Sequence, residues 1–395
     1  MTLPRGLAVL ALAVALALAG TGDPTPAADP RDEPATAGQA ESTLQPRLTL
    51  RQAVGQRMIF PYASATPPQG LRKRISRGEA AGVILFGRNV SSAAHLRAAM
   101  RGLQNIERPP GLRAPLLVLV DQEGGAVRRL PGPPRRGAQR MAAGGSAEVR
   151  RQGRLAASTL RGAGANVNLA PVGDLARRGS AMNREGRAFG PDHWAVARLS
   201  AAFAEGLRQG GVAATAKHFP GFGRARVNTD DAPQRIATRP GTLRRIDGVP
   251  FRRMIDEGVE VVMMSTAVYP ALDARPAALS HRWVEDELRE RLGFGGVVIS
   301  DDLQTPAVAG YGESPRLAER AVRAGVDLPL FAQDYASAAR AAEGLVDAAQ
   351  RGSLGRSRIE EGARRVLALR ERVGSDVSPP VLSSSDLRRR QRTGR

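Results

Sequence analysis

The sequence predicts an α/β fold, a (β/α)8 barrel of the TIM type that forms a single domain. The first observation is a set of eight short runs, most of them rich in Val, Ile and Leu, which is typical of buried parallel strands. The second is that helical patterns fill the gaps between these runs, and the third is that polar residues or glycines usually follow each run. An open, doubly wound sheet is the alternative that the same alternation allows.

The predicted strands span Arg57–Phe60, Gly82–Phe86, Leu116–Val120, Ala165–Leu169, Val212–Ala216, Val259–Met264, Gly296–Ser300 and Val326–Leu330. Among the predicted helices are Ala93–Asn105, Ala147–Ala163, Trp194–Arg208 and Ser314–Ala324. The chain has 395 residues, and one barrel can occupy most of that length. Aromatic residues make up only 4%, so we expect an aliphatic core. No cysteine is present, which excludes disulfides, thiolate catalysis and cysteine-bound metal.

The formal net charge of +20 is that of a nucleic-acid binder, but its distribution argues against this class. Lys73 and Lys217 are the only lysines, and the arginines that supply the rest of the charge are spread along the chain. We therefore expect no nucleic-acid partner and a monomeric protein. One dense cluster, the arginines of the C-terminal segment 388–395, forms a solvated tail or contacts an anionic cell-wall polymer.

The N-terminus resembles an export signal, so we expect a secreted or extracytoplasmic protein. Residues 1–19 combine the basic Arg5 with an apolar run from Leu7 to Ala19 that is short for a membrane span. Thr21 stands where a lipoprotein would need its cysteine, which favours release over anchoring. Residues 20–46 are predicted to be a disordered linker, 47–373 the barrel and 374–395 a disordered basic tail.

Ionisable residues follow several of the predicted strands, where barrel active sites lie. Asp121 follows the third strand; a short carboxylate can accept two sugar hydroxyls, and Arg128 and Arg129 are near enough in sequence to pair with it. Lys217 and His218 follow the fifth strand, and a lysine is informative in a chain that otherwise uses arginine.

Two adjacent carboxylates, Asp301 and Asp302, follow the seventh strand and suit a nucleophile with a structural partner. One of the two could instead cap the next helix. Asp174, after the fourth strand, either orders the site or contributes to binding. No spacing of residues predicts a metal site.

Six strings, taken in chain order, resemble the bacterial single-domain β-N-acetylglucosaminidases of glycoside hydrolase family 3. They are VDQEGG, ANVNLAPVGDL, GRAFGPD, KHFPGFG, AALSHRWVEDELRERLGFGGVVISDDL and AGVDLPLF, and the resemblance runs from about residue 50 to 370. It implies a barrel catalytic domain, removal of terminal β-linked N-acetylglucosamine with retention of configuration, and no metal or other cofactor. It also implies Asp301 as the nucleophile and a set of sugar-binding residues: Asp121, Arg129, Arg187, Lys217 and His218.

The chain departs from the family pattern in the loop after Lys217-His218. The second histidine of the family's KHFPGHG string is Phe222 here, and its following Asp-Ser-His is replaced by Asn228-Thr229-Asp230. The histidine that donates the proton in the family is therefore missing.

Three hypotheses remain open for this loop. In the first, Asp230 or its neighbour Asp231 replaces the histidine as general acid/base. In the second, the protein binds sugar but hydrolyses it poorly, with a rate loss of roughly 10²–10⁴-fold. In the third, the barrel is a non-hydrolytic protein of the cell surface that uses its basic tail for contact.

Overall fold

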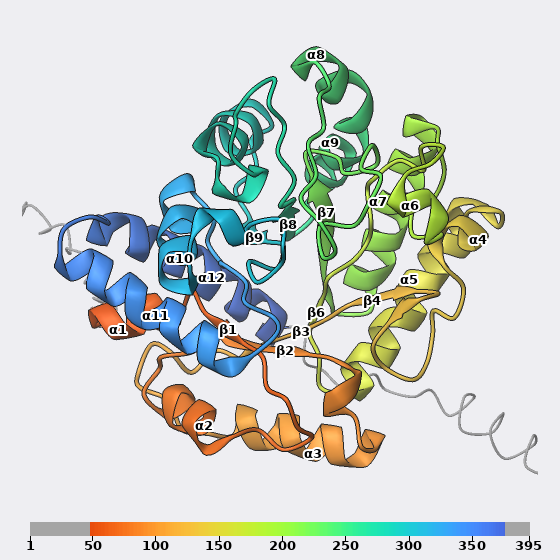
Figure 1. The fold of residues 1–395 in the computed structure, drawn as a ribbon. Coiled ribbons are helices and arrows are strands. Elements are labelled where there is room, and N and C mark those ends of the chain that lie inside the picture. The colour runs from red at the N-terminus through yellow and green to blue at the C-terminus, as the bar shows by residue number, and fades with distance from the viewer. Residues whose placement is uncertain (1–47, 376–395) are drawn as a thin grey trace, which may run out of the picture. The chain divides into compact units, whose positions relative to one another are not determined.

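The computed structural model describes residues 48–375, so the predicted export signal, linker and most of the basic tail lie outside the described residues. Its centre is a curled parallel sheet of seven strands in the order β1-β2-β3-β6-β7-β8-β9 (Figure 1). The strands are β1 (Ile59–Phe60), β2 (Gly82–Leu85), β3 (Leu117–Val120), β6 (Val167–Asn168), β7 (Ala213–Phe219), β8 (Val261–Met264) and β9 (Val297–Ser300). This strand order confirms the barrel-type α/β fold and excludes the doubly wound alternative, whose strand order reverses.

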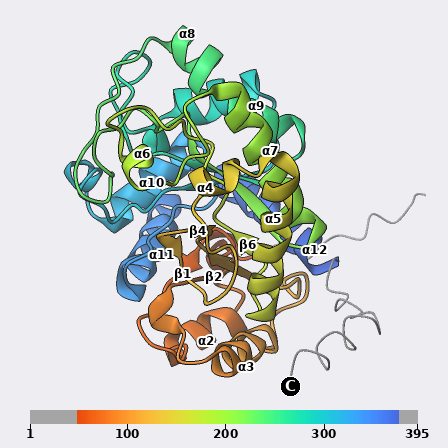
Figure 2. The ribbon, with the colours of Figure 1, turned by 90° about the vertical axis from the view of Figure 1, so that its right-hand side faces the viewer.

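Helices connect successive strands and surround the sheet, as Figures 1 and 2 show. They are α1 (Leu50–Gly55), α2 (Gln69–Ser76), α3 (Ala93–Gln104), α4 (Ala138–Ala142), α5 (Gly145–Gly162), α6 (Ala181–Arg184), α7 (His193–Gln209), α8 (Pro240–Thr242), α9 (Val249–Asp256), α10 (Ser314–Ala324), α11 (Tyr335–Gln350) and α12 (Arg356–Ser375). The four helices predicted from sequence correspond to α3, α5, α7 and α10, with bounds within two residues. Within residues 48–375, no helix combines the length and apolarity that crossing a membrane requires.

The strands divide their side chains between two apolar clusters, as the period of two along a strand requires. Leu117 and Leu119 of β3 belong to the inner cluster, which fills the space enclosed by the sheet. Val118 and Val120 alternate with them and pack outward against the helices. Three residues of α12, at positions 366, 369 and 373, join the inner cluster, so one face of this last helix packs against the barrel interior.

The prediction of an eighth strand at Val326–Leu330 is wrong, because this segment does not form a full strand. Backbone hydrogen bonds join this segment to β9, from the Leu328 N–H to the Val298 carbonyl at 3.0 Å and from the Ser300 N–H to the Leu328 carbonyl at 3.1 Å. They form one isolated parallel bridge, between Ile299 and Leu328, and no strand. On its other side, the buried guanidinium of Arg57 donates to the carbonyl oxygens of Val326 and Asp327 (3.0 Å for the latter), which β1 would otherwise have to approach. A side chain therefore replaces strand pairing at the seam between the first and last segments of the barrel.

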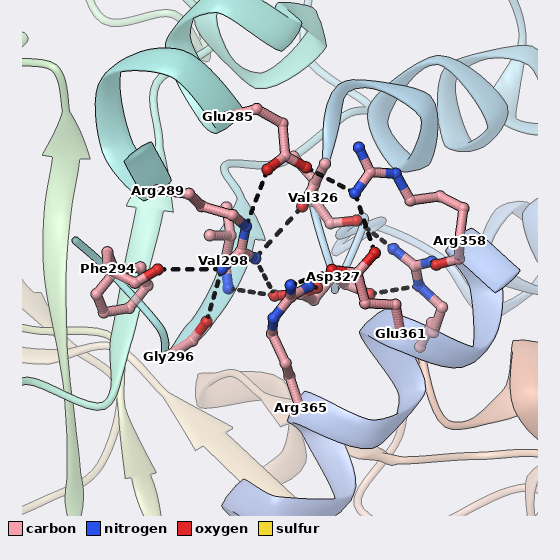
Figure 3. A network of polar contacts seen from close by, with 12 residues as sticks. Glu285, Arg289, Phe294, Gly296, Val298, Val326, Asp327, Arg358, Glu361 and Arg365 are labelled. Atoms are coloured by element: carbon pink, nitrogen blue, oxygen red, sulfur yellow. Dashed lines mark hydrogen bonds and ion pairs between the residues drawn. The ribbon is translucent and has the colours of Figure 1, made fainter. Parts of the chain in front are cut away.

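Asp327 fixes this last segment through a network of charges (Figure 3). Its carboxylate accepts hydrogen bonds from Arg289 at 2.7 Å, Arg365 at 3.1 Å and the backbone N–H of Val298 at 2.8 Å. The three donors come from the π-helical segment 282–291, from α12 and from β9, so one buried carboxylate holds three elements in register.

We predict that replacing Arg57 with Met lowers the free energy of unfolding by about 3 kcal/mol, because three buried carbonyl oxygens would lose their donor. Chemical denaturation would measure the loss. Arg51→Met is the matched control, because Arg51 is an exposed arginine whose partner is the surface carboxylate of Glu343. Equal stability of the two variants would contradict the role of Arg57 in the seam.

Candidate active site

A pocket of about 350 Å³ opens at the carboxyl ends of the strands, where barrel active sites lie. All seven site residues predicted from the sequence line it: Asp121, Arg129, Arg187, Lys217, His218, Asp230 and Asp301. Lys217 and His218 lie in the last part of β7, and the others come from the loops after β3, β6, β7 and β9, so segments far apart in the sequence meet in one cavity.

Lys217 lines the pocket and is only 2% exposed. Its Nζ contacts Asp121 Oδ1 and Glu123 Oε1, each at 2.7 Å. Burial alone would lower the pKa of Lys217, but the two carboxylates outweigh it and raise the pKa above its ordinary value. Lys217 is therefore a fixed positive charge at neutral pH.

The ion pairs of Lys217 continue through Glu123 to Arg187. Arg187 donates two hydrogen bonds to Glu123, at 2.8 and 2.9 Å, and a third to Glu185 at 3.2 Å. Burial would raise the pKa of Glu123, but the Arg187 and Lys217 charges hold it well below its ordinary range. Glu123 is thus a permanent anion that joins two sugar-binding candidates.

The predicted pairing of Asp121 with Arg128 or Arg129 is wrong. The carboxylate of Asp121 pairs with Lys217, whereas Arg128 donates to the carbonyl of Gly132. The backbone carbonyl of Asp121 does accept a hydrogen bond from the Arg129 N–H at 3.1 Å. The reason is geometric. Lys217 lies on β7, two strands along the sheet from β3, and its side chain reaches the Asp121 carboxylate within the pocket.

A short hairpin, β4 (Gln122–Gly124) with β5 (Val127–Arg128), positions the carboxylates after β3. Asn168, at the end of β6, accepts a hydrogen bond from the Gln122 N–H at 3.0 Å. The Gln122 side chain donates to two carbonyls of the following loop. Gly124 has a φ of +104°, and a Cβ there would lie 2.3 Å from the Arg136 carbonyl oxygen, so glycine is required at this turn.

The first half of the loop after β7 is held firmly by buried partners. Asp174 Oδ2 contacts His218 Nδ1 at 2.7 Å, and Asp174 Oδ1 accepts the Phe222 N–H at 2.6 Å. The Tyr269 hydroxyl donates to the Gly221 carbonyl at 3.1 Å. The loop is therefore fixed from His218 to Phe222 by side chains of two other segments.

The second half of this loop carries Asp230 to the edge of the pocket. Its backbone N–H donates to Asn228 Oδ1 at 3.2 Å, and Asn228 lines the pocket beside it. Asp230 keeps an exposed surface, yet the surrounding protein displaces enough water to raise its pKa to about 6, and the negative charges of Asp301 and Asp302 act in the same direction. The carboxyl group is therefore partly protonated near neutral pH.

Asp301 and Asp302 differ in how their carboxylates are used. Asp302 Oδ1 accepts the backbone N–H groups of Gln304 at 3.1 Å and Ala332 at 3.0 Å, and Oδ2 accepts from Gln333 at 3.2 Å. Burial raises the pKa of Asp302 to about 6 in spite of these donors. Asp301 lines the pocket and accepts one local hydrogen bond, from the Asp302 N–H at 2.9 Å. Asp302 is thus the structural partner, and Asp301 the carboxylate available to a ligand.

Sequence reasoning missed several residues of the pocket. The Arg88 and Arg129 guanidinium carbons lie 4.7 and 5.8 Å from the centre of the Phe86 ring, and all three residues line the pocket. Phe86 ends the second predicted strand and Arg88 follows it, so the strand-end argument could have found both. Glu185 and Gln333 lie in loops that no sequence pattern distinguishes.

The residues from 48 to 375 contain no group of three or more histidine, aspartate or glutamate side chains arranged to hold a metal ion. The chemistry that the pocket residues themselves support is proton transfer and nucleophilic attack by carboxylates, beside fixed cations that can bind hydroxyl groups.

Comparison with known proteins identifies the class to which this pocket belongs. The model of the glycosyl hydrolase family 3 N-terminal domain matches residues 49–369. A protein of Arthroderma benhamiae named an uncharacterized secreted glycosyl hydrolase is 36% identical over 348 residues, covering 85% of this chain and 98% of the relative. A β-hexosaminidase of Nitrosomonas eutropha is 35% identical over 290 residues, covering 71% and 82%.

A solved structure agrees with these relatives. The crystal structure of β-N-acetylhexosaminidase from Beutenbergia cavernae has a TM-score of 0.75 and 34% sequence identity, and the match covers 82% of this chain and 99% of that one. The protein is a glycosidase. More specifically, the chain belongs to glycoside hydrolase family 3, as the resemblance of its motifs predicted.

We predict that Lys217→Met lowers the free energy of unfolding by about 3 kcal/mol at pH 7, because Asp121 would lose its partner and Glu123 one of two. Glu123 has a depressed pKa, so its ion pairs stabilise the fold above the unfolded pKa of about 4.3, and this contribution is lost as the pH falls below it. The difference between the two proteins should therefore shrink at about pH 3.5, as denaturant titration would measure.

The matched control is Lys73→Met, because Lys73 is the other lysine of the chain and is exposed on α2. A loss of similar size in both lysine variants would contradict the importance of the buried site.

Proposed function

We propose that the protein removes terminal β-linked N-acetylglucosamine, or a related N-acetylhexosamine, with retention of configuration. Support for this substrate comes from the β-hexosaminidase relatives and from the N-acetylhexosaminidase of similar fold. The observation that carries the mechanism is that Asp230 and Asp301 line one pocket, Asp230 with a raised pKa and Asp301 with its carboxylate open to a ligand.

In the first step, Asp301 attacks the anomeric carbon while the glycosidic C–O bond breaks, and Asp230 gives its proton to the leaving oxygen. In the second step, Asp230 takes a proton from water, the water oxygen attacks the anomeric carbon, and the bond to Asp301 breaks. The atoms balance as the hydrolysis of one glycosidic bond, and both carboxyl groups return to their starting states.

Asp230 is the better proton donor of the two carboxyl groups whose pKa is about 6. Both oxygens of Asp302 already accept hydrogen bonds that tie it to the loops at 304 and 332–333. For the carboxylate of Asp230, no hydrogen-bond donor occurs among residues 48–375. A group with this pKa and open access can carry the proton that a histidine carries elsewhere in the family.

The remaining pocket residues bind the sugar in this proposal. Asp121 and His218 accept hydroxyl protons, whereas Lys217, Arg129 and Arg187 supply donors. The ion pairs through Glu123 keep the two most buried cations of the pocket, Lys217 and Arg187, in fixed positions. Little conformational entropy of these side chains is therefore lost when the sugar binds.

Weak hydrolysis with retained sugar binding is the second candidate. It is favoured by the replacement of the usual histidines by Phe222 and Asp230, and by the exposure of Asp230 at the pocket edge. A non-hydrolytic surface role is the third, and the arginine tail that would mediate it lies outside the described residues.

We also propose that the protein is exported. The apolar run from Leu7 to Ala19 behind Arg5 supports this, as does the name of the similar secreted glycosyl hydrolase. An exported enzyme of this class would meet N-acetylglucosamine in polymers outside the cytoplasm rather than in recycled fragments.

We predict that Asp301→Asn abolishes turnover of an aryl N-acetyl-β-glucosaminide, because an amide is a far weaker nucleophile than a carboxylate. A slow substrate with a good leaving group should form a covalent adduct on Asp301 in the wild-type protein, visible by mass spectrometry. Full activity in the variant would contradict the proposed mechanism.

We predict that Asp230→Asn slows hydrolysis of N-acetylglucosamine disaccharides by roughly 10²–10⁴-fold, while a dinitrophenyl glycoside loses much less in the glycosylation step. The reason is that a good leaving group departs without a proton. Equal losses on both substrates, measured as kcat/KM, would show that Asp230 is not the donor.

The pH dependence of kcat/KM provides a second test of Asp230 as the proton donor. Asp230 must be protonated to act as acid, so kcat/KM on disaccharides should fall as the pH rises through about 6. Asp302→Asn separates the two carboxyl groups of similar pKa: the falling limb remains if Asp230 is the donor.

A further inference from the structure

We infer that Asp174 is a positioning residue for sugar binding: it fixes the His218 ring so that Nδ1 donates to Asp174 and Nε2 is presented to a sugar hydroxyl. This inference rests on the proposed function, because it assigns an orienting role within the same pocket. It starts from a buried carboxylate that the proposed mechanism does not use.

The backbone brings Asp174 to His218 by strand register. After β6 the chain continues beside β7, where Val172 forms a parallel bridge with Lys217 and the Gly173 N–H donates to the Lys217 carbonyl at 2.6 Å. Asp174 directly follows Gly173, and His218 directly follows Lys217. Their proximity therefore follows from the same pairing that places Lys217 in the pocket.

Asp174 is 0% exposed, and its carboxylate receives its hydrogen bonds from the end of β7 and the loop that follows. His218 approaches it twice, with the backbone N–H at 3.2 Å and the ring Nδ1 at 2.7 Å, and Phe222 donates its backbone N–H at 2.6 Å. Within residues 48–375, neither a lysine nor an arginine forms an ion pair with it. A buried carboxylate without a permanent counter-ion is costly, so these N–H donors, including the ring, are what stabilise its charge.

This arrangement defines the tautomer of the ring. A carboxylate accepts hydrogen bonds, so Nδ1 must carry the proton, and a neutral ring then leaves the lone pair on Nε2. The edge of the Phe222 ring packs against the imidazole, with centroids 5.8 Å apart and planes at 65°, which restricts rotation of the ring. Because His218 lines the pocket, Nε2 is the atom that a sugar hydroxyl can reach.

The wild-type protein provides a test that depends on neither mutagenesis of Asp174 nor hydrolysis. The chain has four histidines, and the 15N signals of the His218 ring can be assigned by their absence in His218→Gln. We expect the Nδ1 atom of the His218 ring to carry a proton in these spectra, and the Nε2 signal to shift when N-acetylglucosamine is added. A ring whose Nδ1 carries no proton would overturn the inference.

A double-mutant cycle tests whether Asp174 acts through the ring. Asp174→Asn alone should weaken N-acetylglucosamine binding and raise KM by roughly 10–100-fold, by analogy with the loss seen when the partner that orients a metal-ligating imidazole is removed. The loss should be similar for good and poor leaving groups, because His218 does not donate the proton. In a His218→Gln background, Asp174→Asn should add little further loss, whereas additive losses would overturn the inference.

Asp247→Asn is the matched control for a purely structural role. Asp247 is also a buried carboxylate, and it fixes the same loop through Arg224, at 2.9 Å, without a hydrogen bond to His218. It should lower stability without coupling to His218→Gln. If Asp174→Asn does not fold, the tautomer measurement still decides. If aryl glycosides are not hydrolysed at all while the tautomer and sugar binding are as expected, the proposed activity fails and the positioning role stands.

Discussion

The pocket depends on the ion pairs of the Lys217 ammonium group with Asp121 and Glu123. The Lys217 side chain extends from β7 to these carboxylates, which follow β3, and β6 lies between the two strands in the sheet. Arg187, from the loops after β6, binds the same Glu123, so charges join the carboxyl ends of three neighbouring strands. Neutral hydrogen bonds, such as that from the Gln122 N–H to Asn168, link the same loops, but these ion pairs join them through charges inside the pocket.

These buried charges contribute more to the fixed geometry of the pocket than to the stability of the fold. Each ion loses its hydration on burial, so the net gain from a buried pair over well-packed apolar side chains is small. What the pairs provide is direction, because Lys217 and Arg187 each have at least two acceptors and cannot move independently. A pocket with fixed donors and acceptors binds hydroxyl groups without first having to order its own side chains.

Sequence reasoning predicted the architecture because each strand leaves a local signal, an apolar run followed by polar residues. It failed at Val326–Leu330, because the pairing there depends on the Arg57 side chain, which is some 270 residues distant in sequence. It found the ionisable pocket residues that lie in family motifs, and it missed Phe86 and Arg88 at a strand end as well as Glu185 and Gln333, which no sequence pattern distinguishes. It also assigned the wrong partner to Asp121, because neighbours in sequence were weighed before neighbours across the sheet.

The loop after β7 shows how a change of residue can preserve a function. From His218 to Phe222 it is fixed by Asp174 and by Tyr269, and from Phe222 onward the chain differs in its chemistry from the family pattern. Where the family pattern has the histidine, Asp230 places a carboxyl group in the pocket that also contains Asp301 and Asp302.

In the proposed mechanism, the raised pKa of Asp230 has a use. Burial raises this pKa to about 6 and the negative charge of Asp301 acts in the same direction, so a fraction of Asp230 holds a proton when the sugar binds. Once Asp301 is bonded to the sugar its charge is gone, and the repulsion that favoured the protonated form of Asp230 weakens. Asp230 then stays deprotonated, which is the state needed to accept a proton from water in the second step. In this proposal the changing charge of Asp301 sets the protonation of Asp230 from one step to the next, in place of the histidine of the family pattern.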